Sequence, residues 1–275
     1  MARRWTAAVV AATAMLLAAC GDDGPQTAGD GKLRVIVGAA PLEFLAEEIG
    51  GEDVVVTNLT PPGTEPHDVE LATDDLDRIE DADLVLYIGG DFQPAFEQAA
   101  AKRGDDAVDV LAAVGESDDP HFWLDPVAMG RAADVVAEKL GGHGRGEPVR
   151  RAIDDLHAAF EHGLGLCDRR VIVTSHDAFG RLAGRYALVT RSIAGLSPEA
   201  EPDADKLAEL ADFVRKEGIT TVFTERLVSP RVAEALAREA GVRTAVLDPV
   251  EGSGGDYFTA MRANLAALRD ALGCE

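Results

Sequence analysis

Basic side chains are scarce in this chain, which has 26 lysines and arginines against 49 aspartates and glutamates and a formal net charge of −23 at pH 7. Such a charge repels phosphate backbones, so nucleic acid is not expected as a partner. It favours the approach of cations, although acidic surfaces also simply keep proteins soluble. Wholesale disorder is excluded, because 47% of the residues are hydrophobic. The length of 275 residues allows one large domain or two of ordinary size.

Cysteine is also rare, with three residues in the chain. The first of them, Cys20, ends an apolar run (TAAVVAATAMLLAA) that follows Arg3 and Arg4 and is too short to be a comfortable membrane span. Residues 1–19 are therefore predicted to be a signal peptide. The letters LAAC resemble the lipobox of bacterial lipoproteins, which are cleaved before the cysteine and lipidated on it. Ordinary signal cleavage with a free Cys20 is the alternative.

Export would place the other two cysteines, Cys167 and Cys274, in an oxidising compartment, where a disulfide between them is expected. Two unrelated buried thiols are the alternative. The bond would close a loop of about 107 residues and stabilise the fold by about 4–5 kcal/mol in the chain-entropy model. Residues 20–32 are predicted to be the lipidated cysteine and a flexible tether. Residues 21–32 and 114–119 are expected to be mobile, and no chemistry is assigned to these two stretches.

The mature chain alternates short β-branched apolar runs with amphipathic stretches, which is typical of α/β proteins with parallel sheets. The letters RVIV occur at residues 34–37 and again at 170–173, each time before a short loop and a helix. This repetition predicts two βα lobes, residues 33–146 and 168–275. The segment 147–167 would join them as a single rigid helix. Its apolar residues share one helical face: Val149, Ile153, Leu156, Phe160 and Leu164.

Three of the six histidines lie where ligands bind in open α/β sheets, beyond the carboxyl ends of strands. His67 follows the strand DVVVTNL, His121 lies in DDPHFWLDP before a helix, and His176 follows the strand VIVT. Each has an ordinary explanation when it is taken alone. His67 could be a solvated loop residue, His121 could stack on Phe122 or Trp123, and His176 could be a polar residue at a helix start.

The other three histidines do not share this placement. His143 lies in a glycine-rich turn. His157 and His162 lie on the linking helix at a spacing of five, which does not suit a shared metal site. All three are predicted to lie on the surface.

A carboxylate is placed like the first three histidines. Asp248 follows the apolar run at 242–247, although an Asp-Pro turn explains it equally well on its own. Three imidazoles and one carboxylate suit Zn, Cu, Fe or Ni and admit Mn, whereas the lack of a sulfur ligand disfavours Cu(I). Four protein ligands leave no position for an activated water, so the metal would be held rather than used in catalysis. An exported zinc hydrolase is not expected, because no H-E-x-x-H motif occurs.

Six segments of the chain resemble the metal-binding lipoproteins of ABC importers for zinc and manganese, the zinc-uptake and TroA-like family. They are PHDVEL, DDPHFWLDP, VTSHDAFGRLAGRYAL, GLSPEAEPDADKLAEL, VFTERLVSPRVAEALAREAGV and LDPVEG. The resemblance implies two α/β lobes, a rigid linking helix and a metal held between the lobes. The ligands that it implies are His67, His121, His176 and Asp248, with Glu65 as the alternative carboxylate.

The resemblance also implies Zn²⁺ as the bound ion, because manganese-selective members tend to carry a glutamate where this chain has His176. Many zinc members have a histidine-rich loop before the HFWLDP-like motif, and here that region is the short acidic stretch LAAVGESDDP. Mn²⁺ or a mixed divalent specificity is therefore the alternative.

The implied protein is not an enzyme but an exported monomeric receptor that delivers metal to an ABC permease. Its lipid would anchor it to the outer face of the cytoplasmic membrane, and a surface adhesin is the remaining alternative. Lobe closure is expected to be small, with the loops around the site moving most. Metal affinity is expected to fall as the pH drops through about 6.5, because ligating imidazoles must be neutral.

Overall fold

The computed structural model describes most of the chain, namely residues 31–116, 118–141, 145–198, 204–252 and 255–275. The predicted signal peptide, Cys20, most of the tether and His143 lie outside the described residues. Among the helices of the described part, none combines the length and the apolar character needed to cross a membrane.

The first lobe is built on a parallel four-stranded sheet with the order β2-β1-β3-β4. Its strands are β1 (Leu33–Val37), β2 (Val54–Asn58), β3 (Leu84–Tyr87) and β4 (Ala107–Asp109). Its helices are α1 (Ala40–Gly50), α2 (Thr73–Asp81), α3 (Pro94–Ala100), α4 (Val110–Ala113) and α5 (Pro126–Lys139). The central strand β1 pairs Val35 with Val56 on one side and with Leu84 on the other. The sequence did not predict β4, whose three residues carry too short an apolar pattern.

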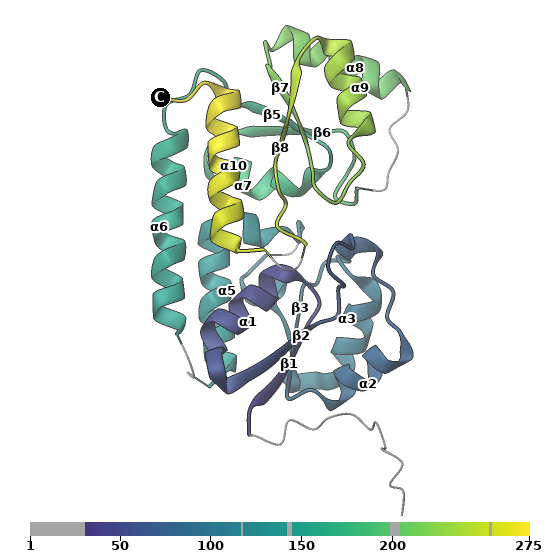
Figure 1. The fold of residues 1–275 in the computed structure, drawn as a ribbon, viewed down its shortest axis with the longest axis vertical. Coiled ribbons are helices and arrows are strands. Elements are labelled where there is room, and N and C mark those ends of the chain that lie inside the picture. Colours follow the sequence, from purple (N-terminus) through teal and green to yellow (C-terminus); the bar gives the residue numbers. More distant parts are fainter. Residues whose placement is uncertain (1–30, 117, 142–144, 199–203, 253–254) are drawn as a thin grey trace, which may run out of the picture.

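The second lobe repeats this arrangement with the order β6-β5-β7-β8, again all parallel. Its strands are β5 (Val171–Thr174), β6 (Val189–Ser192), β7 (Thr221–Thr224) and β8 (Arg243–Val246). Its helices are α7 (Gly180–Arg185), α8 (Ala204–Lys216), α9 (Arg231–Ala240) and α10 (Tyr257–Leu272). The predicted α/β fold with two parallel-sheet lobes is therefore confirmed (Figure 1).

Short 3₁₀ helices interrupt the loops of both lobes. They are Gly51–Asp53, Pro66–Asp68, Ala101–Asp106, Phe122–Leu124 and Asp177–Phe179. Three of them matter for the site, because each contains or directly follows one of the three histidines singled out in the sequence.

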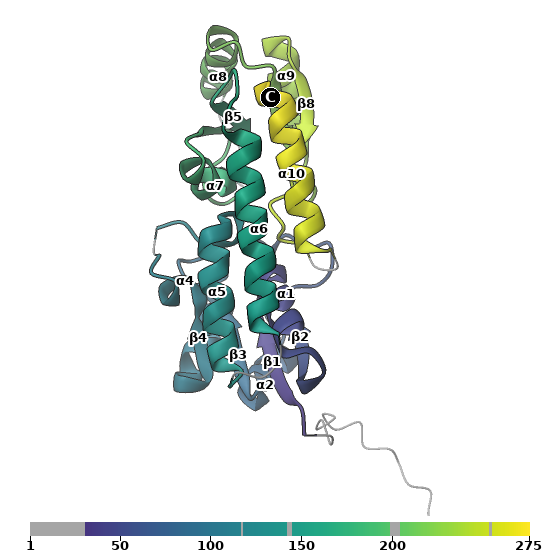
Figure 2. The ribbon, with the colours of Figure 1, turned by 90° about the vertical axis from the view of Figure 1, so that its left-hand side faces the viewer.

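The helix α6 (Gly146–Leu164) links the lobes and runs alongside both of them (Figure 2). Its 19 residues span about 28 Å at about 1.5 Å per residue. The face predicted to be apolar is buried against α1 and α5 of the first lobe and α10 of the second. One hydrophobic core extends from Val35 in β1 through Phe160 in α6 to Leu268 in α10. Because the core is continuous across both lobes, a large hinge motion would break well-packed contacts.

The predicted disulfide is present between Cys167 and Cys274, with a sulfur–sulfur distance of 2.00 Å. It joins the segment that follows α6 to the segment that follows α10. The same two residues also form an isolated antiparallel bridge. The C-terminal ends of α6 and α10 are thus tied together at the end of the molecule away from the first lobe (Figure 1).

Candidate metal centre

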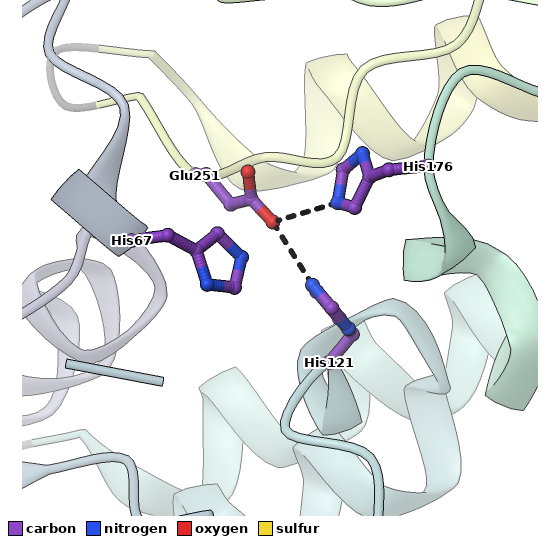
Figure 3. A group of neighbouring side chains, drawn as sticks. All are labelled: His67, His121, His176 and Glu251. Carbon is purple, nitrogen blue, oxygen red and sulfur yellow. Dashed lines mark ion pairs between the residues drawn. The ribbon is translucent and has the colours of Figure 1, made fainter. Parts of the chain in front are cut away.

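Three histidines and one glutamate converge between the two lobes (Figure 3). One potential ligand atom from each of His67, His121, His176 and Glu251 lies within 4.8 Å of the others. The Nε2 atoms of His121 and His176 lie 3.3 Å and 3.8 Å from Oε1 of Glu251. The ring of His67 is centred 5.7 Å from that of His121 and 6.2 Å from that of His176. The structure therefore brings together the three histidines that the sequence singled out.

The loop after β2 presents His67 through the 3₁₀ turn Pro66–Asp68. Buried hydrogen bonds hold this loop in place, because Nε2 of Gln93 donates to the carbonyl of Pro66 at 3.1 Å and to Thr60 Oγ1 at 2.9 Å. The imidazole packs edge-on against Phe92, with ring centroids 4.5 Å apart. An apolar wall thus limits the directions in which the His67 ring can turn.

Asp119 orients His121 from two positions behind it in the sequence. Its Oδ1 accepts from the backbone N–H of His121 at 2.9 Å and lies 2.8 Å from Nδ1 of the ring. The side chain of His121 is completely buried beside Phe92 and Trp123. With Nδ1 engaged by Asp119, Nε2 is the nitrogen that faces Glu251. A carboxylate behind a histidine fixes its tautomer and ring orientation at many metal sites.

Glu225 has the corresponding role for His176. The neighbouring strands β5 and β7 end side by side, so a residue just after β7 reaches the histidine that follows β5. Glu225 accepts from the backbone N–H of His176 at 3.0 Å, and its second oxygen contacts Nδ1 of the ring. The Nε2 atom is again left pointing at Glu251.

The atoms that face the centre of this cluster have no hydrogen-bond partners. Among the described residues, no hydrogen bond reaches either oxygen of Glu251 or the Nε2 atoms of His67, His121 and His176. Leaving such groups buried and unsatisfied costs about 1–3 kcal/mol each. A cation coordinated by one atom of each residue would satisfy the cluster, so the residues present fit a bound metal ion. Zinc takes histidine nitrogens and carboxylate oxygens in a four-coordinate site.

The pKa values of the cluster are shifted by burial and by mutual contacts. Burial lowers the pKa of His67 to about 4. Burial also disfavours the charged form of His121, but Asp119 and Glu251 outweigh this effect and raise its pKa to about 9. Glu251 is fully buried, yet the nearby histidines, His121 foremost, hold its pKa below the usual value. A metal ion bound at the cluster would therefore displace a proton from His121, and the raised pKa of His176 acts in the same direction, whereas burial favours the neutral form of His67.

The carboxylate of the cluster differs from the one expected from the sequence. Asp248 does not reach the histidines, because its Oδ2 lies 2.7 Å from Nε of Arg226 and its Oδ1 accepts from the N–H of Val250 at 2.9 Å. The carboxylate that joins them is Glu251, three positions later in the same LDPVEG segment. The structure thus places Glu251, and not Asp248, beside the three histidines. The available signal in the sequence was the second acid of that segment, Glu251, which lies farther from the end of the strand than Asp248 does.

The alternative carboxylate, Glu65, lies next to the cluster but is not one of its four members. Its Oε1 accepts from the backbone N–H of His67 at 3.3 Å, and its Oε2 is buried without a hydrogen-bond partner in the described structure. Burial raises the pKa of Glu65 to about 7, and the charge of Glu251 adds to the shift. Glu65 thus supports the turn that carries His67.

The acidic stretch 114–119, expected to be mobile and without a role, is instead attached to the second lobe. Asp119 holds His121, and its own carbonyl accepts from Nε of Arg181 in α7 at 2.7 Å. Arg181 also pairs with Glu116. Residue 117 lies outside the described residues. The described part of this stretch therefore contributes to the contact between the lobes.

Two of the remaining histidines are described, and both lie on α6. His162 is exposed, as predicted. His157 is half-buried rather than on the open surface, and its Nδ1 lies 3.0 Å from the hydroxyl of Tyr186. Neither belongs to the cluster.

Comparison with known proteins gives a consistent result. Residues 35–271 match the family model described as zinc-uptake complex component A, periplasmic. The high-affinity zinc uptake system protein ZnuA of Bacillus subtilis is 30% identical, and the match covers 99% of each chain. The zinc-binding protein AdcA of Streptococcus pyogenes serotype M3 is 31% identical over 89% of this chain, which spans 57% of the length of AdcA.

Solved structures agree with the sequence relatives. The Zn(II)-bound ZnuA-like domain of Streptococcus pneumoniae AdcA aligns with a TM-score of 0.73 and 28% identity, covering 88% of this chain and 99% of the domain. The laminin-binding protein Lmb of Streptococcus agalactiae, described as having adhesin and metal-transporting activity, aligns with a TM-score of 0.79 and 27% identity, covering 87% and 99%. The resemblance seen in the sequence motifs is confirmed, and the chain belongs to the family of zinc-uptake complex component A proteins.

Proposed function

We propose that this protein is an extracytoplasmic receptor that captures Zn²⁺ between its lobes and delivers it to an ABC permease. The ligands are His67, His121, His176 and Glu251. One observation carries the proposal: these four side chains meet at one buried point, and the atoms that face it lack hydrogen-bond partners within the described structure. A site that costs stability when it is empty is expected to have a ligand that compensates.

The donor set favours zinc. Three imidazoles and one carboxylate provide three nitrogens and one oxygen, whereas Mn²⁺ prefers sites richer in oxygen. Zinc is also the metal named for the relatives ZnuA and AdcA and for the solved AdcA domain. The lack of a histidine-rich loop does not alter this preference, because none of the four proposed ligands lies in that region.

The same geometry indicates binding without catalysis. Four protein ligands close a tetrahedral zinc site and leave no open position for an activated water. Asp119 and Glu225 hold two of the histidines so that Nε2 faces the ion, which reduces the reorganisation needed for capture. Release then requires some ligands to be drawn apart, a change that docking on the permease would supply. The continuous core along α6 limits this change to a small movement of the lobes and their loops.

The location belongs to the same proposal. The letters LAAC at Cys20 fit lipidation, and the relative AdcA of Streptococcus pneumoniae strain R6 is named a zinc-binding lipoprotein. We infer a monomer that is exported and anchored through Cys20 to the outer face of the cytoplasmic membrane. Labelling with a radioactive fatty acid, compared between the wild-type chain and Cys20→Ala, tests the anchor.

Elemental analysis of protein purified without added metal tests the proposed function. About one zinc per chain is expected, together with competition against a chromogenic chelator that gives the affinity. The matched variant His121→Ala should lose most of this zinc, whereas His162→Ala, on the exposed face of α6, should keep it. Zinc content that is unchanged in His121→Ala, or copurification with manganese alone, would contradict the proposal.

A further inference from the structure

The loop that carries Glu251 leaves the second lobe but is held by the first. The indole Nε1 of Trp123 donates to the carbonyl of Pro249 at 2.7 Å, in a buried hydrogen bond. The hydroxyl of Tyr257, at the start of α10, donates to the carbonyl of Trp123 at 2.7 Å, and this bond is buried as well. Trp123 follows His121 by two positions. The segment bearing one proposed ligand is thus bonded to the loop bearing another.

The backbone of this loop adopts a conformation that its sequence disfavours. Val250, directly before Glu251, has a φ of 59°. A β-branched residue rarely occupies the left-handed region, and such strain persists only where the surroundings hold it in place. Here the N–H of Val250 donates to Oδ1 of Asp248. Asp248 is itself fixed by two backbone contacts with the side chain of Asn264, at 2.8 Å and 2.7 Å.

The side chain of Glu251 cannot provide this orientation by itself. Its two oxygens have no hydrogen-bond partners among the described residues, and its nearest polar neighbours are other members of the same cluster. The direction of the carboxylate must therefore come from the backbone that precedes it. Asp248 and Asn264 fix the beginning of the loop, and Trp123 fixes its middle at Pro249.

We propose that Trp123 is a positioning residue: its indole N–H, placed by the hydroxyl of Tyr257, holds the strained loop so that Glu251 reaches the metal site. This inference deepens the proposed zinc-binding function and rests on it. It also assigns a role to the tryptophan of the HFW segment beyond packing in the core. In addition, it explains how Glu251, which comes from the second lobe, is held in position relative to His121 of the first lobe.

The test compares zinc affinities, measured by chelator competition, for the wild-type protein, Trp123→Phe, Tyr257→Phe and Glu251→Gln. Trp123→Phe and Tyr257→Phe are each expected to weaken binding about tenfold or more, as loss of a group that orients a ligand does. Adding Trp123→Phe to Glu251→Gln should change the affinity by less than about twofold, because the loop then carries no carboxylate to position. Tyr186→Phe, which loses a hydroxyl contact with His157, is the matched control and should bind like the wild type.

Cobalt(II) provides a readout that a purely structural role would not change. The visible absorption of bound Co²⁺ depends on its ligands, so Trp123→Phe should give a spectrum that resembles that of Glu251→Gln. Wild-type affinity and spectrum in both Trp123→Phe and Tyr257→Phe would overturn the inference. An equal loss of affinity when Trp123→Phe is added to Glu251→Gln would also overturn it, since that result indicates general destabilisation.

Two further outcomes are distinguishable from these. If circular dichroism shows that Trp123→Phe does not fold, Tyr257→Phe decides the matter, because it removes a single hydroxyl. If the wild-type protein itself retains no zinc, the proposed function fails and the inference falls with it. If the wild-type protein binds zinc and the variants match it, only the role of Trp123 is refuted.

Discussion

The Nε2 atom of His121 lies 3.3 Å from Oε1 of Glu251, and both side chains are completely buried where the two lobes meet. The contact joins a base whose pKa is raised to about 9 to a carboxyl whose pKa is lowered. In the metal-free protein these shifts favour a protonated His121 beside an ionised Glu251, a contact that does not meet hydrogen-bond geometry. A divalent cation bound in the cluster would take the place of that proton, so its binding would depend on pH.

Zinc affinity is expected to rise between about pH 6 and pH 9, by up to about tenfold per pH unit for each released proton. His121, whose pKa of about 9 lies above the range in which a free histidine titrates, releases one proton. His176 adds to the effect, because its contact with Glu225 raises its pKa despite burial. The expected midpoint near pH 6.5 is thus moved upward. His67 adds nothing to the slope, because its pKa is about 4 and it is neutral throughout. Calorimetry in buffers of different ionisation enthalpy counts the released protons, and a pH-independent affinity would contradict this assignment.

His176→Ala should reduce zinc affinity by more than about tenfold, because it removes a proposed ligand and leaves one oxygen of Glu225 buried without the ring nitrogen that it contacts. Competition against a chelator measures the change. His162→Ala is the control, since that side chain is exposed on α6 and outside the cluster. A smaller loss than this in His176→Ala would mean that His176 does not bind the ion.

Substitution of the two acids of the LDPVEG segment should affect zinc affinity to clearly different extents. Glu251→Gln removes the negative charge from the centre of the cluster and should weaken zinc binding by about tenfold or more. Asp248→Asn keeps the oxygen that accepts from Val250 and loses a partly exposed ion pair with Arg226, so its effect should stay within about threefold. The same competition assay compares them. An equal loss of zinc affinity in both variants, or a larger loss in Asp248→Asn, would instead support Asp248 as the ligand.

Replacing both disulfide cysteines tests the contribution of the bond. The double variant Cys167→Ser, Cys274→Ser should lower the free energy of unfolding by about 4–5 kcal/mol in the chain-entropy model, because the bond closes a loop with a sequence separation of 107. Urea denaturation of the metal-free protein is the measurement, since bound zinc would add its own stabilisation. Zinc stoichiometry should be retained, because the bond lies at the end of the second lobe away from the site (Figure 1). An unchanged urea midpoint would show that the bond contributes nothing.

Local sequence patterns determined much of the fold. The two RVIV runs predict β1 and β5 because buried parallel strands are continuous apolar segments. The apolar face of α6 follows from helical periodicity, and its five predicted residues are all buried. The strand β4 was missed because a three-residue strand carries no pattern of its own and forms only beside β3.

The sequence also indicated the three histidines of the cluster, through their positions relative to the predicted strands and helices. In a parallel α/β sheet the strand ends that carry functional loops meet at one edge, so chain position places His67 at that edge of the first sheet and His176 at that edge of the second. The packing of the two lobes then brings these residues and His121 together. The two cysteines were paired by elimination, once export set the compartment. These inferences need only local pattern and general topology.

The tertiary structure decided which carboxylate lies beside the three histidines. Asp248 and Glu251 lie in one short loop, and no local rule separates them. The hydrogen bonds from Asn264 and Trp123 and the left-handed backbone of Val250 turn Asp248 toward Arg226 and Glu251 toward the histidines. Contacts between residues distant in sequence determine these directions, because a side chain's orientation after a strand end depends on what packs against the loop.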